Sequence, residues 1–331
     1  MSTRDDLLIS LCMIVKNEEA MLPACLESVR SVVDEMIMVD TGSTDSSAEI
    51  ARAFGVNVID HTWNHNFAEA RNDGLKRAKG KWILVLDADE VLTEQSGKKL
   101  RETVTNTKAD ALTLIIRNPT PKGELQTYSD FTLTRLFRNN DQYRYERMIH
   151  EQIRPSIEKT CGVIENSDLV IFHKGYSGGT VQGNDSRVRR NLQLLEKSVK
   201  EYPDDPYLLY QLGATYKQMG EEQKAIEILR KAELVDDGRI LLTETRALLY
   251  MKLSQLALAG DEYGNAVRYA KKCLAIEPNN LIGLYVIGVA LLYQHKIKEA
   301  GAYLLQARSH PQLRMEETEQ LDQLITFCGH R

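Results

Sequence analysis

The sequence predicts an α/β domain, Rossmann-like with a mostly parallel sheet, followed by an all-α domain of tetratricopeptide repeats. Three observations predict this order. Strand-like and helix-like patterns alternate in the first half, the strand-like runs end at acidic residues, and the second half repeats itself. The expected boundaries are 1–180 for the α/β domain, 181–205 for a linker or helix, and 206–331 for the repeats with a C-terminal capping helix.

The composition indicates an ordinary soluble protein that is large enough for two cores. The formal net charge is −5, so no overall basic field favours nucleic acid, and we expect no nucleic-acid partner. Five cysteines without C-x-x-C spacing indicate a reducing compartment. The apolar run 7–15 lacks the flanks of a signal peptide, and no run reaches the ~18 apolar residues of a membrane span. We therefore expect a cytoplasmic chain without an integral membrane segment.

The first strand is expected at Leu7 to Val15, a continuous apolar run typical of a strand buried on both faces. The next elements are expected at 18–33 (helix), 35–39 (strand), 47–54 (helix), 56–59 (strand), 67–79 (helix) and 81–86 (strand). Ser43 or Thr44 is expected to cap the second helix. Such alternation predicts a doubly wound sheet, in which ligands bind beyond the carboxyl ends of the strands. Asp40 and Asp87 lie at such ends.

Shorter strand-like runs follow at 111–116, 131–137 and 169–172. The glycine-rich stretch 175–183 comes next and predicts a mobile loop. Tyr176 in this loop is expected to help close the loop over a ligand and exclude water.

The second half repeats small residues at equivalent positions. Gly213 aligns with Ser254 and Gly288, and the step from Ala266 to Ala300 is the 34-residue tetratricopeptide period. The first step is longer by seven residues, which predicts an insertion around 239–245. We expect three repeats and a capping helix at 316–327, in preference to an unrelated helical bundle.

The triplet Asp87-Ala88-Asp89 directly follows an apolar strand-like run. Carboxylate oxygens at that position suit Mg²⁺ or Mn²⁺ that bridges phosphates. Most D-x-D sequences are solvated turns, and the place of this one at a strand end favours a metal site. Asp40, followed by Gly42, can accept a hydrogen bond from a nucleobase, although the same segment is also an ordinary turn.

Four ordered motifs together resemble those of the inverting family 2 glycosyltransferases with a GT-A fold. They are L-C-M-I-V-K-N-E-E from Leu11, V-D-T-G-S-T-D from Val39, F-A-E-A-R-N from Phe67 and V-L-D-A-D-E from Val85. Within this family the chain is most similar to bacterial members with tetratricopeptide repeats, which include lipooligosaccharide glucosyltransferases and peptide S-glycosyltransferases.

The resemblance implies a UDP-sugar donor and a role for each motif. Asp40 would read the uracil ring, Arg71 would face the base or diphosphate, and Asp87 would contact the ribose or the metal. Asp89 would be the main ligand of Mn²⁺ or Mg²⁺. The remaining residues implied to line the nucleotide sugar are Ile14, Val15, Asn17, Glu18 and Ala88.

An inverting displacement needs a general base, and the region after the triplet offers carboxylates. In the enzymes that this chain resembles, a carboxylate near Glu151 serves as base, so Glu151 is the candidate and Asp130 the reserve. A side chain facing solvent is the alternative interpretation of Glu151. His173 ends an apolar run and is a candidate third metal ligand, although a lone histidine there is as often structural.

The resemblance therefore implies transfer of a hexose or N-acetylhexosamine from a UDP-sugar, with inversion. Because repeats form concave surfaces, we expect a peptide or protein acceptor, with a saccharide acceptor or self-association into a homo-oligomer left open. One alternative is a non-catalytic nucleotide-sugar-binding module whose repeats bind a partner protein. Another is a nucleotidyltransferase, which would need a glycine-rich basic loop where this chain has Lys16 to Glu19.

Overall fold

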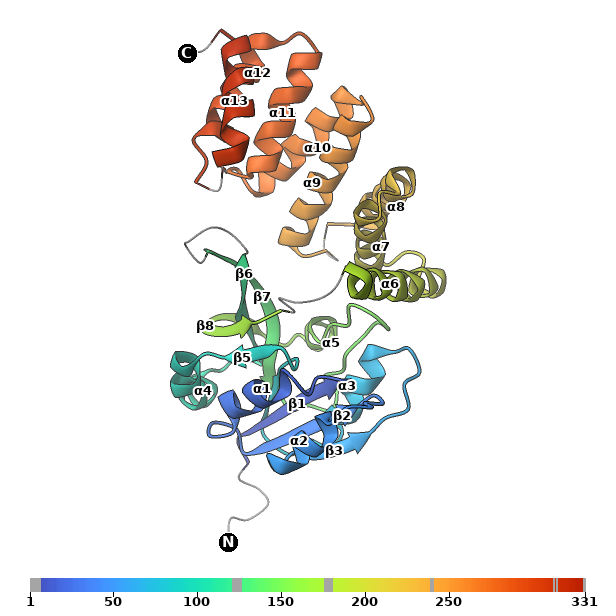
Figure 1. Cartoon of the computed structure of the whole chain (residues 1–331), viewed down its shortest axis with the longest axis vertical. Helices are drawn as coiled ribbons and strands as arrows, with labels where there is room; N and C mark the ends of the chain where they lie inside the picture. Colours follow the sequence, from blue (N-terminus) through green and yellow to red (C-terminus); the bar gives the residue numbers. More distant parts are fainter. Residues whose placement is uncertain are drawn as a thin grey trace. The chain divides into compact units, whose positions relative to one another are not determined.

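The computed structural model describes residues 7–120, 127–175, 181–238, 241–311, 313 and 315–329. The chain divides into two compact units, Met1–Arg187 and Val188–Arg331 (Figure 1). The division falls within 181–205, where the sequence predicts a linker or helix, and this segment is occupied by helix α6 (Val181–Glu201). The prediction that Tyr176 closes a loop lies outside the described residues.

An eight-stranded sheet with the order β3-β2-β1-β4-β7-β6-β8-β5 forms the centre of the first unit. Strands β1 to β4 pair in parallel, β7 pairs antiparallel with β4 and β6, β8 is parallel to β6, and β5 is antiparallel to β8. The predicted α/β fold with a mostly parallel sheet is confirmed, and the antiparallel pairs lie in its second half. The strand bounds are β1 (Ile9–Val15), β2 (Glu35–Asp40), β3 (Asn57–Asp60), β4 (Trp82–Val85), β5 (Glu90–Leu92), β6 (Ala111–Thr120), β7 (Thr127–Arg138) and β8 (Ile164–His173).

Helices cover both faces of this sheet because alternate strand residues point to opposite sides. Ile9, Leu11 and Met13 of β1 pack in one core with helices α1, α2 and α4, whereas Cys12 packs in a second core with α3 and α5. The residues of β1 named here are at most 4% exposed, as a strand covered on both faces requires. The helix bounds are α1 (Leu22–Val29), α2 (Ser47–Ala53), α3 (Phe67–Leu75), α4 (Glu94–Asn106) and α5 (Arg154–Lys159).

Two predictions about these helices were wrong. Helix α1 is much shorter than the predicted 18–33, because residues 18–21 form turns and the proline of the first turn marks the start of the helix. Neither Ser43 nor Thr44 caps α2. The Ser43 hydroxyl instead accepts the backbone N–H of Asn17, and the carboxylate of Asp45 accepts the N–H of Ser47.

The second unit is helical and contains three helix pairs that match the predicted repeats. They are α7 (Pro206–Gln218) with α8 (Glu222–Val235), α9 (Thr243–Ala259) with α10 (Tyr263–Ile276), and α11 (Leu281–Tyr293) with α12 (Ile297–Arg308). Helix α13 (Met315–Phe327) packs against the last pair as the predicted cap (Figure 1). None of the helices within the described ranges is both long and apolar enough to cross a membrane.

Repeat packing depends on the small residues that the sequence aligns. A Cβ atom on Gly213 would lie 2.6 Å from Cγ of Leu229, and one on Gly288 would lie 2.5 Å from Cδ2 of Leu304. The two leucines occupy the same place in their repeats. Glycine therefore lets the two helices of the first and third pairs approach closely, and the small Ser254 occupies the aligned position in the second pair.

Candidate active site

The predicted site residues lie beyond the carboxyl ends of the parallel strands. Asp40 is the last residue of β2, and Asp87 follows β4 after one intervening leucine. Asp89 directly precedes β5. The parallel strands thus bring Asp40 and the acidic triplet to one edge of the sheet, as ligand sites in open α/β sheets require.

Asp40 is held in place by the turn that follows it. Its Oδ1 accepts the backbone N–H groups of Gly42 (3.0 Å) and Ser43 (2.8 Å), and Gly42 has φ +98°, a conformation that favours glycine. Asp40 is only 7% exposed, and no group in the described part of the chain hydrogen bonds to its Oδ2. One carboxylate oxygen is therefore fixed by the backbone, and the other remains available to a ligand.

The loop after β1 is tied to the loop after β2. Asn17 has φ +57°, and its Oδ1 accepts the N–H of Thr44 at 2.7 Å. The N–H of Glu18 donates to the Ser47 hydroxyl at 2.8 Å. The predicted nucleotide-binding residues Asn17 and Glu18 are thus positioned next to the Asp40 turn. At the base of the loop, the carbonyl oxygen of the buried Val15 accepts hydrogen bonds from the hydroxyl and the N–H of Thr41.

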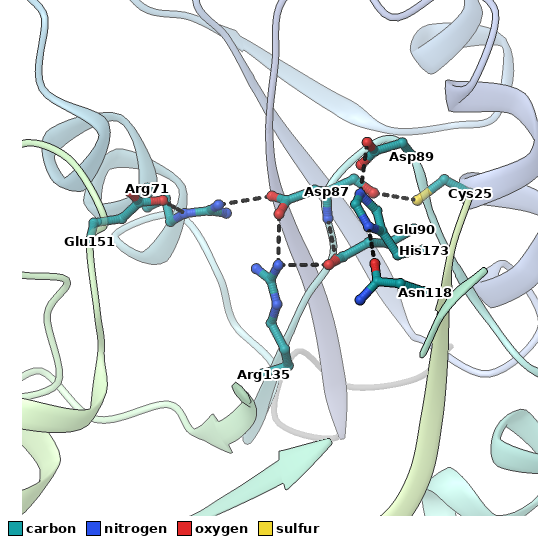
Figure 2. Close-up of polar contacts among 9 residues, drawn as sticks. All are labelled: Cys25, Arg71, Asp87, Asp89, Glu90, Asn118, Arg135, Glu151 and His173. Carbon is teal, nitrogen blue, oxygen red and sulfur yellow. Dashed lines mark hydrogen bonds and ion pairs between the residues drawn. The ribbon is translucent and has the colours of Figure 1, made fainter. Parts of the chain in front are cut away.

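Arg71 of α3 links the acidic triplet to the candidate base. Its Nη2 donates to Oδ1 of Asp87 at 2.8 Å, and its Nε donates to Oε1 of Glu151 at 2.6 Å (Figure 2). Its guanidinium lies over the ring of Tyr145 at 5.4 Å. The Nη1 atom is buried without a hydrogen-bond partner among the described residues. Three residues that the sequence selects separately are therefore in direct contact.

Arg135 of β7 contacts the triplet from the other side. A single nitrogen, Nη2, donates to Oδ2 of Asp87 at 2.6 Å and to Oε1 of Glu90 at 2.7 Å. Glu90 is 3% exposed, and its Oε2 accepts the backbone N–H of Asp87 at 2.8 Å. The N–H of Glu90 in turn donates to the carbonyl of Asp87. Asp87 is thus held by two guanidinium groups (Figure 2).

Burial and neighbouring charges together explain the pKa shifts in this cluster. Burial alone would raise the pKa of Asp87, but the positive charges of Arg135 and Arg71 outweigh it and hold that pKa well below its ordinary value. Burial raises the pKa of Glu90, against the opposing charge of Arg135. Burial also raises the pKa of Tyr145 to about 12, so its hydroxyl is neutral.

Asp89 faces away from the arginines and contacts His173. Its Oδ2 lies 3.1 Å from Nε2 of His173, whose Nδ1 lies 2.6 Å from Oδ1 of Asn118. The ladder between β5 and β8 pairs Glu90 with His173, which brings the two strands together. The hydrogen bond to Asp89 raises the pKa of His173, more than burial lowers it.

The donor set of this pair fits a divalent cation. The Asn118 oxygen accepts from Nδ1, so the other ring nitrogen is the one that can turn a lone pair toward a metal. The Asp89 carboxylate and phosphate oxygens are ligands that Mn²⁺ and Mg²⁺ both prefer, and the imidazole of His173 fits Mn²⁺ better than the harder Mg²⁺. Within the described ranges, no cluster of three or more His, Cys, Asp or Glu residues has the arrangement of a metal site.

The segment from Tyr145 to Glu151 is hydrogen bonded to α3, which places Glu151 beside this helix. The Asn72 side chain exchanges two hydrogen bonds with the backbone of Tyr145, at 2.8 and 3.0 Å. His150 precedes Glu151 with φ +52°, and burial lowers the pKa of its imidazole. The Glu151 side chain is 12% exposed. The structure therefore turns Glu151 inward, which contradicts the alternative of a side chain that faces solvent.

The reserve base Asp130 has a different setting. It lies on β7, 39% exposed, with both oxygens bound to the guanidinium of Arg117. That ion pair lowers the pKa of Asp130. No contact in the described part of the chain joins Asp130 to the triplet.

The remaining predicted residues are Ile14, at the end of β1, and Ala88, which is 5% exposed within the triplet. Sequence reasoning missed Arg135, Glu90 and Asn118 as members of the site. The signal for Arg135 was an arginine next to the apolar pair Leu136 and Phe137 of a strand-like run, in T-L-T-R-L-F-R. Glu90 lies inside the quoted motif but had no role assigned.

Comparison with known proteins gives matches in both halves. Residues 10–163 match the family described as Glycosyl transferase family 2, and residues 194–227 and 247–280 match tetratricopeptide repeats. A TPR repeat-containing protein of Synechococcus elongatus is 33% identical over 301 residues, which cover 88% of this chain and 72% of that protein.

Two further proteins are more distantly similar to this chain. The prophage-derived glycosyltransferase SunS of Bacillus subtilis is 26% identical over 68% of this chain, and this chain spans about half of the relative, 53% of its length. The crystal structure of S. aureus TarS 1-349 in complex with UDP superposes with a TM-score of 0.47 at 13% identity, covering 88% of this chain and 92% of that one.

Proposed function

Because the chain is a member of the family 2 glycosyltransferases with C-terminal tetratricopeptide repeats, we propose that it transfers a hexose or N-acetylhexosamine from a UDP-sugar to its acceptor. We further propose that transfer inverts the anomeric carbon and depends on Mn²⁺ or Mg²⁺. The observation that carries this proposal is a cluster of contacts at one site. Arg71 binds both Glu151 and Asp87, and Asp89 of the same triplet contacts His173.

The donor would bind along the carboxyl edge of the parallel strands. The free Oδ2 of Asp40 can accept the imide N–H of uracil, which distinguishes this base from cytosine. Asn17 and Glu18 lie on the loop tied to the Asp40 turn and would line the uridine. Arg71, with an unpaired Nη1, would bind the diphosphate and favour the charge that develops on it.

Asp89 and His173 would hold the cation, with Asn118 fixing the imidazole ring. When bound, the cation would neutralise the leaving diphosphate as a Lewis acid. Asp87 would contribute to this site through its contacts with Arg71 and the triplet backbone.

Glu151 would act as general base. It would take the proton from the acceptor heteroatom while that atom attacks the anomeric carbon and the bond from this carbon to the diphosphate oxygen breaks. Attack opposite to the leaving group inverts the configuration. Arg71 would orient Glu151 through the 2.6 Å contact with its Oε1.

We propose a peptide or protein acceptor, or a saccharide, with the repeats contributing to its recognition. We also propose that transfer takes place in the cytoplasm. All five cysteines are free thiols in the structure, which agrees with a reducing compartment.

Asp89→Asn tests the proposal. Transfer and hydrolysis of UDP-glucose and UDP-N-acetylglucosamine would be measured with Mn²⁺, with Mg²⁺ and with EDTA, and the anomeric configuration of the product determined by NMR. We expect Asp89→Asn to remove the cation-dependent activity. Asp168→Asn on β8, which loses only an exposed contact with Lys99, is the control. Full activity of folded Asp89→Asn protein would refute the metal assignment.

A further inference from the structure

Arg135 is the one member of the cluster that contacts two acidic residues of the D-A-D-E segment (Figure 2). It comes from β7, which pairs antiparallel with β4, so the strand that precedes the triplet and the strand that carries Arg135 are neighbours. Arg135 is 7% exposed. A buried guanidinium is retained only when carboxylates compensate its charge, and here Asp87 and Glu90 do so.

The two aspartates of the triplet have different hydrogen-bond partners. Both oxygens of Asp87 bind guanidinium groups, Oδ1 that of Arg71 and Oδ2 that of Arg135. Neither arginine contacts Asp89, whose Oδ2 lies toward His173 instead. A carboxylate with both oxygens in charge-assisted hydrogen bonds is a poorer cation ligand, because the two guanidinium charges repel a cation and each oxygen has one lone pair already engaged.

The Arg135 contact also closes the turn that carries Asp89. Glu90 binds Arg135 with one oxygen and the N–H of Asp87 with the other, while its own N–H donates to the carbonyl of Asp87. Asp89 lies within this ring of contacts. A movement of Glu90 would therefore change where the Asp89 carboxylate points.

We propose that Arg135 is a positioning residue with two roles. It holds Asp87 away from the cation, and through Glu90 it fixes the turn so that Asp89 is the one residue of the triplet that faces the cation. This inference rests on the proposed cation-dependent function. It gives Asp87 a different role from Asp89, because Asp87 serves as the anchor of the two arginines.

The test compares Arg135→Met with wild type. Removal of a positive charge leaves Asp87 and Glu90 free to attract the cation, so Mn²⁺ should bind at least as tightly, as measured by EPR titration in the presence of UDP. The rate constant kcat should nevertheless fall about 10- to 100-fold, the usual effect of losing a residue that orients a metal ligand. Hydrogen exchange of the 87–90 amides, measured without ligands, should become faster.

Arg138→Met is the matched control, because Arg138 lies on the same strand, donates to the Ala109 and Thr107 carbonyls and packs over Trp82. It should not change exchange at 87–90. Arg135→Lys should retain part of kcat because it retains the charge. Arg135→Met with Glu90→Gln should recover part of kcat, because the second change removes the unpaired buried carboxylate.

Several results would overturn the inference. One is an Arg135→Met protein whose hydrogen exchange at 87–90 and whose kcat are the same as in wild type. Another is loss of Mn²⁺ affinity in step with kcat, as a purely structural role predicts. If Arg135→Met does not fold, the same measurements on Arg135→Lys decide. Wild-type protein that binds neither Mn²⁺ nor UDP would refute the proposed function instead, and the ligand-free exchange data would still test the positioning role.

Discussion

Glu151 and Asp130 are both paired with arginines, yet their partners differ in what else they touch. Arg71 binds Glu151 and also Asp87, whereas Arg117 binds Asp130 on a half-exposed part of the hairpin between β6 and β7. Only Glu151 is therefore in contact with the cluster around the triplet. This difference separates the two candidate bases.

Glu151→Gln should lower kcat about 10²- to 10⁴-fold, the contribution typical of a general base. The amide keeps the shape of the side chain, so the affinity for UDP should change little. Steady-state kinetics and calorimetric titration with UDP measure the two quantities. Asp130→Asn is the control and should stay within a few-fold of wild type. A larger loss in Asp130→Asn than in Glu151→Gln would reverse the assignment.

Asn118 supports His173 through its side-chain oxygen at 2.6 Å. Asn118→Ala should weaken Mn²⁺ binding about 10-fold or more, because the imidazole loses the contact that fixes its orientation. Asn166→Ala is a matched control on the same strand pair, where the lost partner is the hydroxyl of Thr113. Equal Mn²⁺ affinities of the two variants would show that Asn118 does not orient the ligand.

At the scale of elements, the start of β1 depends on a charge. Asp34 accepts the N–H groups of Leu8 (2.8 Å) and Ile9 (2.9 Å) and a bond from Arg101 (2.9 Å). Burial alone would raise the pKa of Asp34, but these hydrogen bonds outweigh it and lower that pKa. The carboxylate therefore stabilises the fold at pH values above its unfolded pKa of about 3.9, and this contribution is lost as the pH falls through the lower, folded pKa.

Asp34→Asn should accordingly lower the free energy of unfolding at pH 7, and the difference from wild type should shrink as the pH falls below the unfolded pKa and through the lower, folded pKa. Urea unfolding at a series of pH values measures this. Asp141→Asn is the control, because the Asp141 side chain is fully exposed. A difference that does not shrink as the pH falls below about 3.9 would mean that the charge of Asp34 is not the cause.

The repeats offer a test of packing at equivalent positions. Gly288→Ala should lower the free energy of unfolding by about 1–3 kcal/mol, because the added Cβ meets the buried Leu304 at 2.5 Å. Gly264→Ala, in the first turn of α10 with open space around it, should be neutral or more stable by up to about 1 kcal/mol. Urea unfolding followed by circular dichroism checks both, and equal effects would contradict the packing argument.

Elements with a strong local pattern were predictable from the sequence. The run that forms β1 is apolar apart from Ser10 because both faces are covered, and the repeat alignment places Gly213 and Gly288 at the same contact. Helix ends were less predictable, as the short α1 shows, because turns and a proline outweigh apolar periodicity. The role of Arg135 was not predictable, because it depends on the antiparallel pairing of β7 with β4, which no local pattern encodes.

At the scale of the whole molecule, the chain contains two compact units with separate cores. The predicted donor site lies wholly in the first. UDP with Mn²⁺ at about 100 times its Kd should therefore stabilise the first unit by about 2.7 kcal/mol and leave the second unchanged. Differential scanning calorimetry measures this, and Gly288→Ala identifies the transition of the repeats. A ligand that shifts the unfolding transitions of both units equally would contradict the prediction that UDP stabilises the first unit alone.

The pairing of β5 with β8 has a consequence for biosynthesis. Asp89 and His173 are 84 positions apart, and the ladder that joins their strands forms only when the last strand of the sheet is added. A nascent chain can complete the parallel strands β1 to β4 much earlier, since their pairings need only the first 85 residues. The ribosome must therefore release residues well beyond 173 before the Asp89 carboxylate meets the His173 imidazole, so a shorter nascent chain would lack the pair that we propose as the cation site.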